Sequence, residues 1–418
     1  MTQDSGLRTQ NSELGTQNSF DWSRGYASRI ARFQGSAIRE MFHWAQLPGM
    51  ISLSAGSPAP ELFPVEPFRE AANYVLEHDA MAAFQYGITE GYVPLREWIA
   101  EQLISKGIHV GVDEVLITTG SLQAFDLLAR VLLNPGDAVV VERPTFIGTL
   151  QALDSCEASY VSARMDEDGL IVDELDQQLA AAAQTPKLMC VQPNFQNPSG
   201  VSLSLERRKQ LVQLASARGI PIVEDDPYAE LIYEGAPLPA VKSFDTEDLS
   251  IYLGSFSKIL MPGLRVGWAA GPRPVLEKMG LIKQGSDLHT DGYIQRVINH
   301  VVRSGFLPGH IKEIRAEYRK RLDTMLAALA EHFPPEARCT RPRGGLFVWV
   351  ELPEGVNCND FMRQAVDQGV LFPPGQGFFR DGTGQNTMRL NFSNQTPDKI
   401  REGVKRLAEV IRQHLANG

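Results

Sequence analysis

Four polar residues past the middle of the chain carry groups that could do chemistry together. Ser255, Ser257 and Lys258 lie within four positions, and Arg265 follows seven positions after the lysine. Two hydroxyl groups and a guanidinium can hold a phosphate dianion, and a lysine amine beside that anion can form an imine with an aldehyde group. Because a lone lysine is usually a solvated surface charge, this interpretation depends on the groups around it.

An acidic run, Glu224-Asp225-Asp226-Pro227-Tyr228, directly follows the apolar residues 221–223. A carboxylate at the end of a buried strand needs a partner, and a cationic ring nitrogen would serve Asp225. A simpler alternative is that Asp226 caps a helix beginning at Pro227. Both interpretations can hold together.

Two further turns end in groups that could face the same ligand. Asn197-Pro198-Ser199-Gly200 would fix the Asn197 amide at a strand end, although Asn-Pro-x-Gly is also a common structural turn. Thr118-Thr119-Gly120-Ser121 precedes a helical stretch whose free N–H groups and dipole favour an anion. An ordinary N-cap serine is the more usual explanation of this second turn.

These polar groups follow short apolar runs that alternate with helical stretches. The apolar runs lie at 138–141, 188–191, 221–223 and 251–253. Short apolar strands separated by helices such as 204–218 predict a largely parallel sheet covered on both faces. Ligands of such sheets bind at the carboxyl ends of the strands, where the polar groups lie.

The C-terminal part shows a different mixture of elements, which predicts a smaller α+β domain. Strands are expected at 344–351 and 388–392, and helices at 308–332, 359–369 and 397–415. At the other end, residues 1–20 are polar and contain Thr-Gln-Asn-Ser twice, at 9–12 and 16–19. That segment lacks apolar periodicity and is expected to be a disordered tail.

Composition narrows the function further. The chain has 418 residues, of which 43% are hydrophobic. Its formal net charge of -10 argues against general binding of nucleic acid or anionic membranes. Its four cysteines lack C-x-x-C spacing and its eight histidines lack H-E-x-x-H pairing, so no metal site is expected. No apolar run is long enough to span a bilayer, so we expect a cytoplasmic protein.

The set Asn197-Pro-Ser-Gly, Asp225-x-x-Tyr228, Ser255-x-Ser257-Lys258 and Arg265 resembles the fold-type I enzymes that use pyridoxal 5'-phosphate (PLP), specifically the class I/II aminotransferases. The resemblance covers about residues 20–418 and is strongest to the 2-aminoadipate and kynurenine aminotransferase group. The runs that carry this further similarity are 37–40, 58–64, 85–87, 285–290 and 342–349.

The resemblance implies an architecture of two domains. Residues 51–305 would form a three-layer α/β/α domain that binds PLP on a mainly parallel seven-stranded sheet, as in aspartate aminotransferase-like enzymes. Residues 306–418 would form the smaller α+β domain, and residues 21–50 would pack with it, after the tail of residues 1–20.

The resemblance also implies roles toward the cofactor. Lys258 would carry PLP as a Schiff base and move the proton during transfer, Asp225 would pair with the pyridine nitrogen, and Phe146 would stack on the ring. Tyr228 and Asn197 would bind the phenolic oxygen. The phosphate would be held by Ser255, Ser257, Arg265 and the backbone N–H groups of Ser121 and Leu122.

Toward the substrate, Arg389 with Asn197 would bind the α-carboxylate, and Gly56 would lie against the bound amino acid. Tyr86 would reach the active site of a neighbouring subunit, which implies a homodimer with a composite site. Arg39 would bind the distal carboxylate of an acidic substrate; the alternative is a solvent-facing helix arginine beside Glu40.

The implied activity is ping-pong transfer of an amino group from an L-α-amino acid to a 2-oxo acid such as 2-oxoglutarate. The expected donors are 2-aminoadipate or glutamate, with aromatic and aliphatic amino acids as further candidates. One alternative is a PLP-dependent lyase on the same scaffold. Another is a transcriptional regulator with a PLP domain, which fits poorly with an acidic chain and about 20 polar residues before the first motif. The physiological donor and the pathway stay open.

Overall fold

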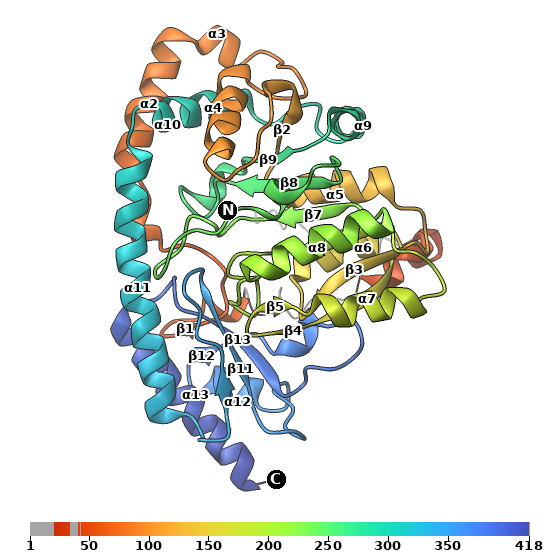
Figure 1. Cartoon of the computed structure of the whole chain (residues 1–418). Coiled ribbons are helices and arrows are strands. Elements are labelled where there is room, and N and C mark those ends of the chain that lie inside the picture. The colour runs from red at the N-terminus through yellow and green to blue at the C-terminus, as the bar shows by residue number, and fades with distance from the viewer. Residues whose placement is uncertain (1–20, 34–40, 42, 418) are drawn as a thin grey trace, which may run out of the picture.

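The computed structural model describes residues 21–33, 41 and 43–417, and within these residues its main feature is an eight-stranded sheet (Figure 1). The strand order is β2 (Val115–Thr118), β9 (Gly267–Ala270), β8 (Ser250–Ser255), β7 (Ile222–Asp225), β6 (Leu188–Val191), β3 (Ala138–Arg143), β4 (Ser159–Asp166) and β5 (Gly169–Leu170). Strands β8, β7, β6, β3 and β4 are parallel, while β9 and β5 run antiparallel to their neighbours. The predicted mainly parallel sheet is confirmed, with the two-residue β5 as an additional edge strand.

Helices cover both faces of the sheet because successive strand residues point to opposite sides. Val139 and Val223 face a cluster with α5 (Ser121–Leu132), α6 (Ile147–Ser155) and α9 (Arg273–Gln284). Val140 and Ile222 face the opposite cluster with α7 (Val172–Ala181) and α8 (Leu205–Arg218). Three further helices extend that second layer over β2 and β9: α2 (Val65–His78), α4 (Val93–Ile104) and α10 (Gly292–Arg303). The domain therefore has the predicted three layers.

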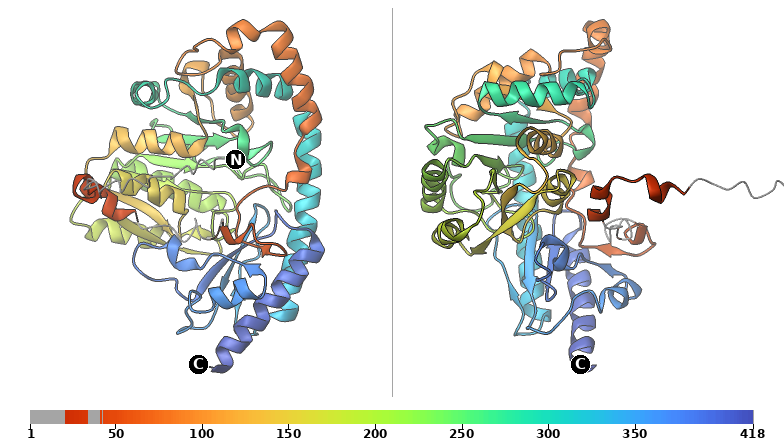
Figure 2. Two further views of the ribbon diagram at one scale, coloured as in Figure 1. Left: turned by 180° about the vertical axis from the view of Figure 1, so that it is seen from behind. Right: turned by 90° about the vertical axis from the view of Figure 1, so that its right-hand side faces the viewer.

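A smaller unit follows in the C-terminal part of the chain. Strands β10 (Arg338–Cys339), β11 (Phe347–Glu351) and β13 (Thr387–Asn391) form an antiparallel sheet. The unit also contains α11 (Leu307–His332), α12 (Met362–Asp367) and α13 (Pro397–Asn417), and its core is a separate apolar cluster. The long helix α11 runs along one side of both units (Figures 1 and 2). This is the α+β unit that the sequence predicts.

The N-terminal part contributes to both units. Strand β1 (Ile51–Ser52) pairs in parallel with β12 (Val370–Leu371) of the smaller unit. Met41 packs on the same unit, whereas the 3-10 helix η2 (Ser28–Arg32) lies against α6 of the larger one. There the Arg32 guanidinium donates to the Ala158 carbonyl at 2.8 Å. Within the described residues of the segment 21–50, which is predicted to pack with the small unit, η2 therefore contacts the larger unit and Met41 the smaller one.

Short elements connect these parts. They are α3 (Ala80–Ala83) and the 3-10 helices η1 (Trp22–Gly25), η3 (Pro60–Leu62), η4 (Val112–Glu114), η5 (Val241–Phe244), η6 (Pro262–Leu264) and η7 (Gly375–Phe378). Residues 1–20, predicted as a tail, lie outside the described residues. Among the helices that are described, none has the length and apolar character needed to cross a membrane.

Candidate active site

A cavity of about 1120 Å³ lies between the two units, at the carboxyl ends of the parallel strands. All predicted site residues except Tyr86 and Arg39 line it. Those from the larger unit and the N-terminal segment are Gly56, Ser121, Leu122, Phe146, Asn197, Asp225, Tyr228, Ser255, Ser257, Lys258 and Arg265, and Arg389 comes from β13. Tyr86 is 79% exposed on the surface, and Arg39 lies outside the described residues.

Strand β8 and the turn after it position three of these residues. The strand ends at Ser255, and the Ser257 N–H donates to the Ser255 hydroxyl at 3.1 Å. Both serines are buried, and Lys258 follows directly at the wall of the cavity. The chain thus presents two hydroxyl groups and one amine at a single strand end.

The Lys258 amine lies in an environment that disfavours its charge. Its Nζ donates to the Gly56 carbonyl at 2.8 Å. Burial lowers the pKa of Lys258 to about 8; Arg389 and Arg265 act in the same direction, and Asp225 opposes them. An amine with this pKa is partly neutral near neutral pH, so it can act as a nucleophile or as a base.

The Asp225 carboxylate ends β7 with one oxygen bonded and the other free. Gln192 donates from Nε2 to Asp225 Oδ2 at 2.5 Å, while Oδ1 is buried without a hydrogen-bond partner among the described residues. Burial raises the pKa of Asp225 to about 6, Asp226 adds to the shift, and the Gln192 bond reduces it. A buried acceptor without a donor is costly, so Oδ1 fits a donor that arrives with a ligand, such as a protonated ring nitrogen.

Gln192, which the sequence did not single out, links two of the predicted site residues. Besides its bond to Asp225, its Oε1 accepts the Asn197 N–H at 3.0 Å. Asn197 in turn makes a side-chain hydrogen bond with Tyr228. One glutamine side chain therefore joins the end of β7 to the turn that carries Asn197. Its position directly after β6 was the available signal, because that is where polar groups of a parallel sheet meet.

Arg389 projects from β13 into the cavity and is held on several sides. Its guanidinium donates to Asn197 Oδ1 at 2.9 Å and to the Ser54 carbonyl at 2.5 Å. The group also lies over the rings of Phe347 and Phe378, at 4.4 and 5.2 Å from their centroids. Burial lowers its pKa to about 10, and Nε is buried with no acceptor in the described part of the chain. This arrangement fits an incoming carboxylate.

A close turn at the start of α5 lies at the wall of the cavity. Gly120 has φ +83°, and a side chain there would overlap the Arg265 guanidinium. A Cβ on Gly267 would come within 2.5 Å of the Ser121 backbone nitrogen. Because the first N–H groups of a helix lack acceptors within it, these N–H groups and Arg265 form a cradle suited to a phosphate.

A buried carboxyl group, which the sequence did not single out, lies beneath the wall of the cavity. Glu142 on β3 is 3% exposed and accepts bonds from the Gln192 N–H at 3.2 Å and from Gln196 Nε2 at 3.0 Å. Burial raises the pKa of Glu142 to about 8, and the charge of Asp225 adds to the shift. The site thus has an inner layer of hydrogen bonds beneath the cavity wall.

The outer part of the cavity mixes apolar and cationic side chains. Phe33, Ile147 and Phe379 supply apolar surface, and Arg32 supplies a guanidinium group. The Arg380 guanidinium is paired with Asp154, which also lines the cavity. The chemistry of this outer part suits both an aromatic and an acidic side chain.

Comparison with known proteins gives matches over most of the chain. A sequence profile of the family described as aminotransferase class I and II matches residues 48–407. The aromatic-amino-acid aminotransferase 1 of Thermococcus litoralis is 42% identical over 402 residues, 94% of this chain and 96% of that protein. The 2-aminoadipate transaminase of Thermus thermophilus is 40% identical over 398 residues, 94% of this chain and 98% of that protein.

A solved structure agrees as well. The crystal structure of Pyrococcus horikoshii kynurenine aminotransferase, in complex with PMP, KYN as substrate and KYA as product, superposes with a TM-score of 0.91. It is 42% identical and covers 94% of this chain and 98% of that chain. The likeness therefore extends over both units and the cavity between them.

Proposed function

Because this chain belongs to the class I and II aminotransferases, which are PLP-dependent transaminases, we propose that it transfers the amino group of acidic and aromatic L-α-amino acids to 2-oxoglutarate. One observation carries this proposal: the same cavity contains an amine of lowered pKa, a buried carboxylate with a free oxygen and a guanidinium with a free N–H. These groups match an aldehyde, a ring nitrogen and an α-carboxylate.

When bound, PLP supplies the aldehyde that takes up the amino group and a ring that withdraws electrons from the reacting carbon. In the proposed arrangement, Asp225 Oδ1 would accept a hydrogen bond from the ring nitrogen, and Asn197 and Tyr228 would bind the phenolic oxygen. Ser121, at the start of α5, and Arg265 would hold the phosphate. Ser255 and Ser257 would contribute hydroxyl groups, Leu122 an N–H group, and Phe146 a ring face.

The protein's own groups then handle the proton and the carboxylate. Arg389 binds the α-carboxylate of the amino acid through Nε and a neighbouring guanidinium N–H, and Gly56 borders the bound substrate. Lys258 Nζ, which is partly neutral near its pKa of about 8, would take the proton from the substrate Cα and deliver it to C4', the former aldehyde carbon of the cofactor.

For the side chain of the substrate, we propose that apolar and cationic surface serve different donors. The apolar wall at Phe33, Ile147 and Phe379 would take aromatic side chains. Arg39 would bind a distal carboxylate, as its position in the Ile-Arg-Glu run suggests. Relatives named for aromatic amino acids, for 2-aminoadipate and for kynurenine support a broad donor range.

The reaction type is tested by a half-reaction. The PLP-bound enzyme is mixed with L-glutamate alone and followed by absorbance, and we expect the band of the aldehyde form to convert to that of the amine form. Release of pyruvate or ammonia from amino acids without such conversion would instead indicate a lyase. Borohydride reduction followed by peptide mapping tests the anchor, which we expect on the peptide containing Lys258.

The donor range is tested with a panel of amino acids and 2-oxoglutarate, on the wild type and on Arg39→Ala. We expect the variant to lose activity selectively with 2-aminoadipate and glutamate, while phenylalanine stays a substrate. An unchanged profile would contradict the proposed role of Arg39. An Arg389→Met variant is the matched comparison, because it should raise the KM of every donor alike.

A further inference from the structure

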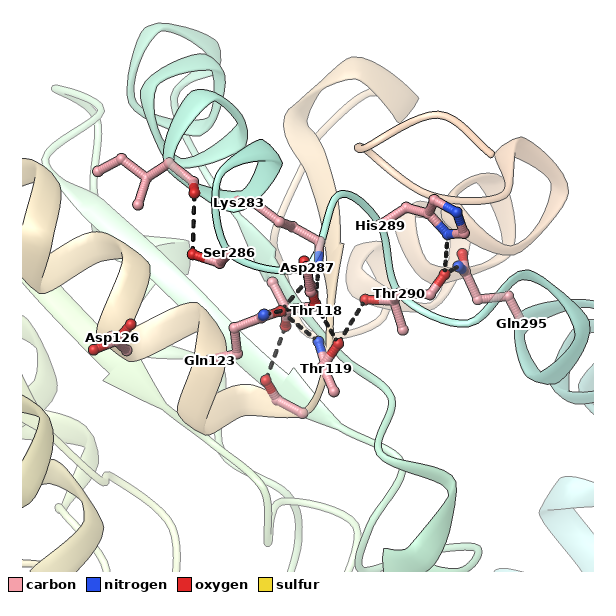
Figure 3. A network of polar contacts seen from close by, with 12 residues as sticks. Thr118, Thr119, Gln123, Asp126, Lys283, Ser286, Asp287, His289, Thr290 and Gln295 are labelled. Atoms are coloured by element: carbon pink, nitrogen blue, oxygen red, sulfur yellow. Dashed lines mark hydrogen bonds and ion pairs between the residues drawn. The ribbon is translucent and has the colours of Figure 1, made fainter. Parts of the chain in front are cut away.

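A lysine that takes no part in the proposed chemistry is completely buried next to the phosphate-binding turn. Lys283, in the last turn of α9, is 0% exposed. Its Nζ donates to both oxygens of Asp287, at 2.8 and 2.9 Å, and to Gln123 Oε1 at 2.9 Å (Figure 3). Removing a charged amine from water costs several kcal/mol unless it is fully paired, so this arrangement calls for an explanation.

The paired carboxylate holds the turn that begins α5. Besides Lys283, Asp287 Oδ2 accepts from Gln123 Nε2 at 2.7 Å and from the Thr119 hydroxyl at 2.8 Å. The Thr119 N–H donates to Gln123 Oε1 at 2.7 Å. Although burial alone would raise it, the pKa of Asp287 is held below its usual value by the bonds from Lys283, Gln123 and Thr119. Both the backbone and the side chain of Thr119 are therefore fixed.

Thr119 immediately precedes the cradle. Next along the chain are Gly120, whose φ of +83° needs a glycine, and Ser121, the first residue of α5. The Arg265 guanidinium also reaches the Thr119 carbonyl, at 3.5 Å. A free turn of this kind would lose conformational entropy when it closes around an anion, and an anchored turn loses little.

We propose that the Lys283–Asp287 pair positions the phosphate cradle and so sets the affinity of the protein for the phosphate group of its cofactor. The two residues are positioning residues, because they act through Thr119 and Gln123 and are not among the cavity-lining residues. The inference rests on the proposed function, which places the phosphate at the start of α5.

The test compares two ligands that differ only in the phosphate. Dissociation constants of PLP and of pyridoxal, which lacks the phosphate, are measured by absorbance on the apoenzymes of the wild type, Lys283→Met and Asp287→Asn. We expect PLP to bind at least about tenfold more weakly to both variants, the size of effect that supporting partners have on a bound ligand. We expect pyridoxal binding to change less than about twofold.

A matched control is available in a second buried lysine. Lys242 is also buried, pairs with Asp245 at 3.9 Å in an i,i+3 arrangement and donates to the Ser250 carbonyl at 2.8 Å. It lies on η5, away from the start of α5. Lys242→Met should alter neither dissociation constant selectively, so a phosphate-specific loss in that variant would overturn the proposal.

Other results with these variants also bear on the proposal. An equal loss of PLP and pyridoxal affinity in Asp287→Asn, or no loss of PLP affinity, overturns the positioning role. If Lys283→Met fails to fold, Asp287→Asn and Thr119→Val carry the test, because both are close in shape to the native residue. An Arg265→Met variant tests the proposed phosphate position itself. If this variant loses PLP and pyridoxal affinity equally, the phosphate does not bind beside Arg265, and the positioning role of the Lys283–Asp287 pair fails as well.

Discussion

At the scale of single residues, Lys258 gains its character from its surroundings. Burial and two nearby guanidinium groups, those of Arg389 and Arg265, lower its pKa to about 8, whereas a solvated lysine keeps a value near 10.5. The sequence places this lysine among serines and one arginine. Only the folded chain brings Arg389 near it, because more than a hundred residues separate the two.

This pKa predicts how the apoenzyme takes up PLP. Only the neutral amine attacks an aldehyde, so the rate of uptake should rise with pH and level off above about 8. Asp225 favours the charged amine, so in Asp225→Asn the inflection should move to lower pH. Stopped-flow absorbance at a series of pH values measures both. An inflection near 10 in the wild type would contradict the prediction.

Glu142 predicts a pH dependence of stability. Its pKa is raised from an ordinary value of about 4.5 to about 8 in the folded state, so the folded protein keeps a proton that the unfolded chain releases. The contribution of Glu142 to stability therefore falls as pH rises from about 4.5 to 8 and is lowest above 8. Glu142→Gln does not titrate and can still accept a bond through its amide oxygen.

We therefore expect apo Glu142→Gln to gain stability over the wild type between pH 5 and pH 9, by roughly 1–3 kcal/mol at the upper end. Thermal denaturation followed by circular dichroism at pH 5, 7 and 9 measures the difference. A difference that does not change with pH would show that Glu142 is ionised throughout this range.

At the scale of elements, the cradle depends on how closely β9 approaches the start of α5. A Cβ on Gly267 would lie 2.5 Å from the Ser121 nitrogen and 2.7 Å from the Gly120 carbonyl carbon. Both are backbone atoms, so the turn itself would have to move. A Cβ on Gly263, in the neighbouring η6, would have no atom of another described residue within 4 Å apart from its chain neighbours.

This contrast predicts opposite results for two glycine substitutions. Gly267→Ala should weaken PLP binding by about tenfold or more and destabilise the protein by about 1–3 kcal/mol, as overpacking does. Gly263→Ala should leave both quantities nearly unchanged. Absorbance titration and thermal denaturation of the two variants provide the check, and equal behaviour would show that the close approach is not needed.

The elements also show how far sequence alone reaches. The four fully apolar runs match β3, β6, β7 and β8, and the long C-terminal helices match α11 and α13. Continuous apolar character marks a strand buried on both faces. The two-residue strands β1 and β12 were not predicted, because so short a run shows no periodicity from which a strand can be recognised.

The register between strands limits what sequence reveals about the site. Val191 pairs with Glu224, so Gln192 comes to lie opposite Asp225 and can donate to it. Nothing in either segment specifies that alignment, and so the bridging glutamine was not predicted. The same holds for Lys283 and Gln123, which meet only because α9 packs beside α5.

At the scale of the whole molecule, the surface near Tyr86 carries several exposed apolar side chains. Met81 is 91% exposed, Phe84 68% and Tyr86 79%. Exposed apolar side chains gathered in one segment commonly mark protein interfaces. The homodimer implied by the family resemblance would cover this segment, and Tyr86 would then reach the partner's cavity.

We therefore predict that Met81→Asp and Phe84→Asp, alone or together, shift the protein toward monomers and weaken PLP binding. A charge buried at an apolar interface is costly, and a monomer would lack the tyrosine supplied by its partner. Sedimentation velocity of wild type and variants gives the oligomeric state. Leu415→Asp on α13, at a side chain that is 38% exposed, is the control; a dimer that survives the first two substitutions contradicts the assignment of this surface.

The pairing of β1 with β12 has a consequence for protein synthesis. Ile51 pairs with Val370, and Arg389 donates to the Ser54 carbonyl. Neither contact can form until the ribosome has added roughly 300 residues after Ile51 and Ser54. At about 5–20 residues per second, the ribosome needs roughly 15–60 s for that stretch. The segments that carry Ser121, Asp225 and Lys258 emerge well before Arg389. The proposed carboxylate-binding residue, Arg389, is therefore made after all of the proposed cofactor-binding residues of the same chain.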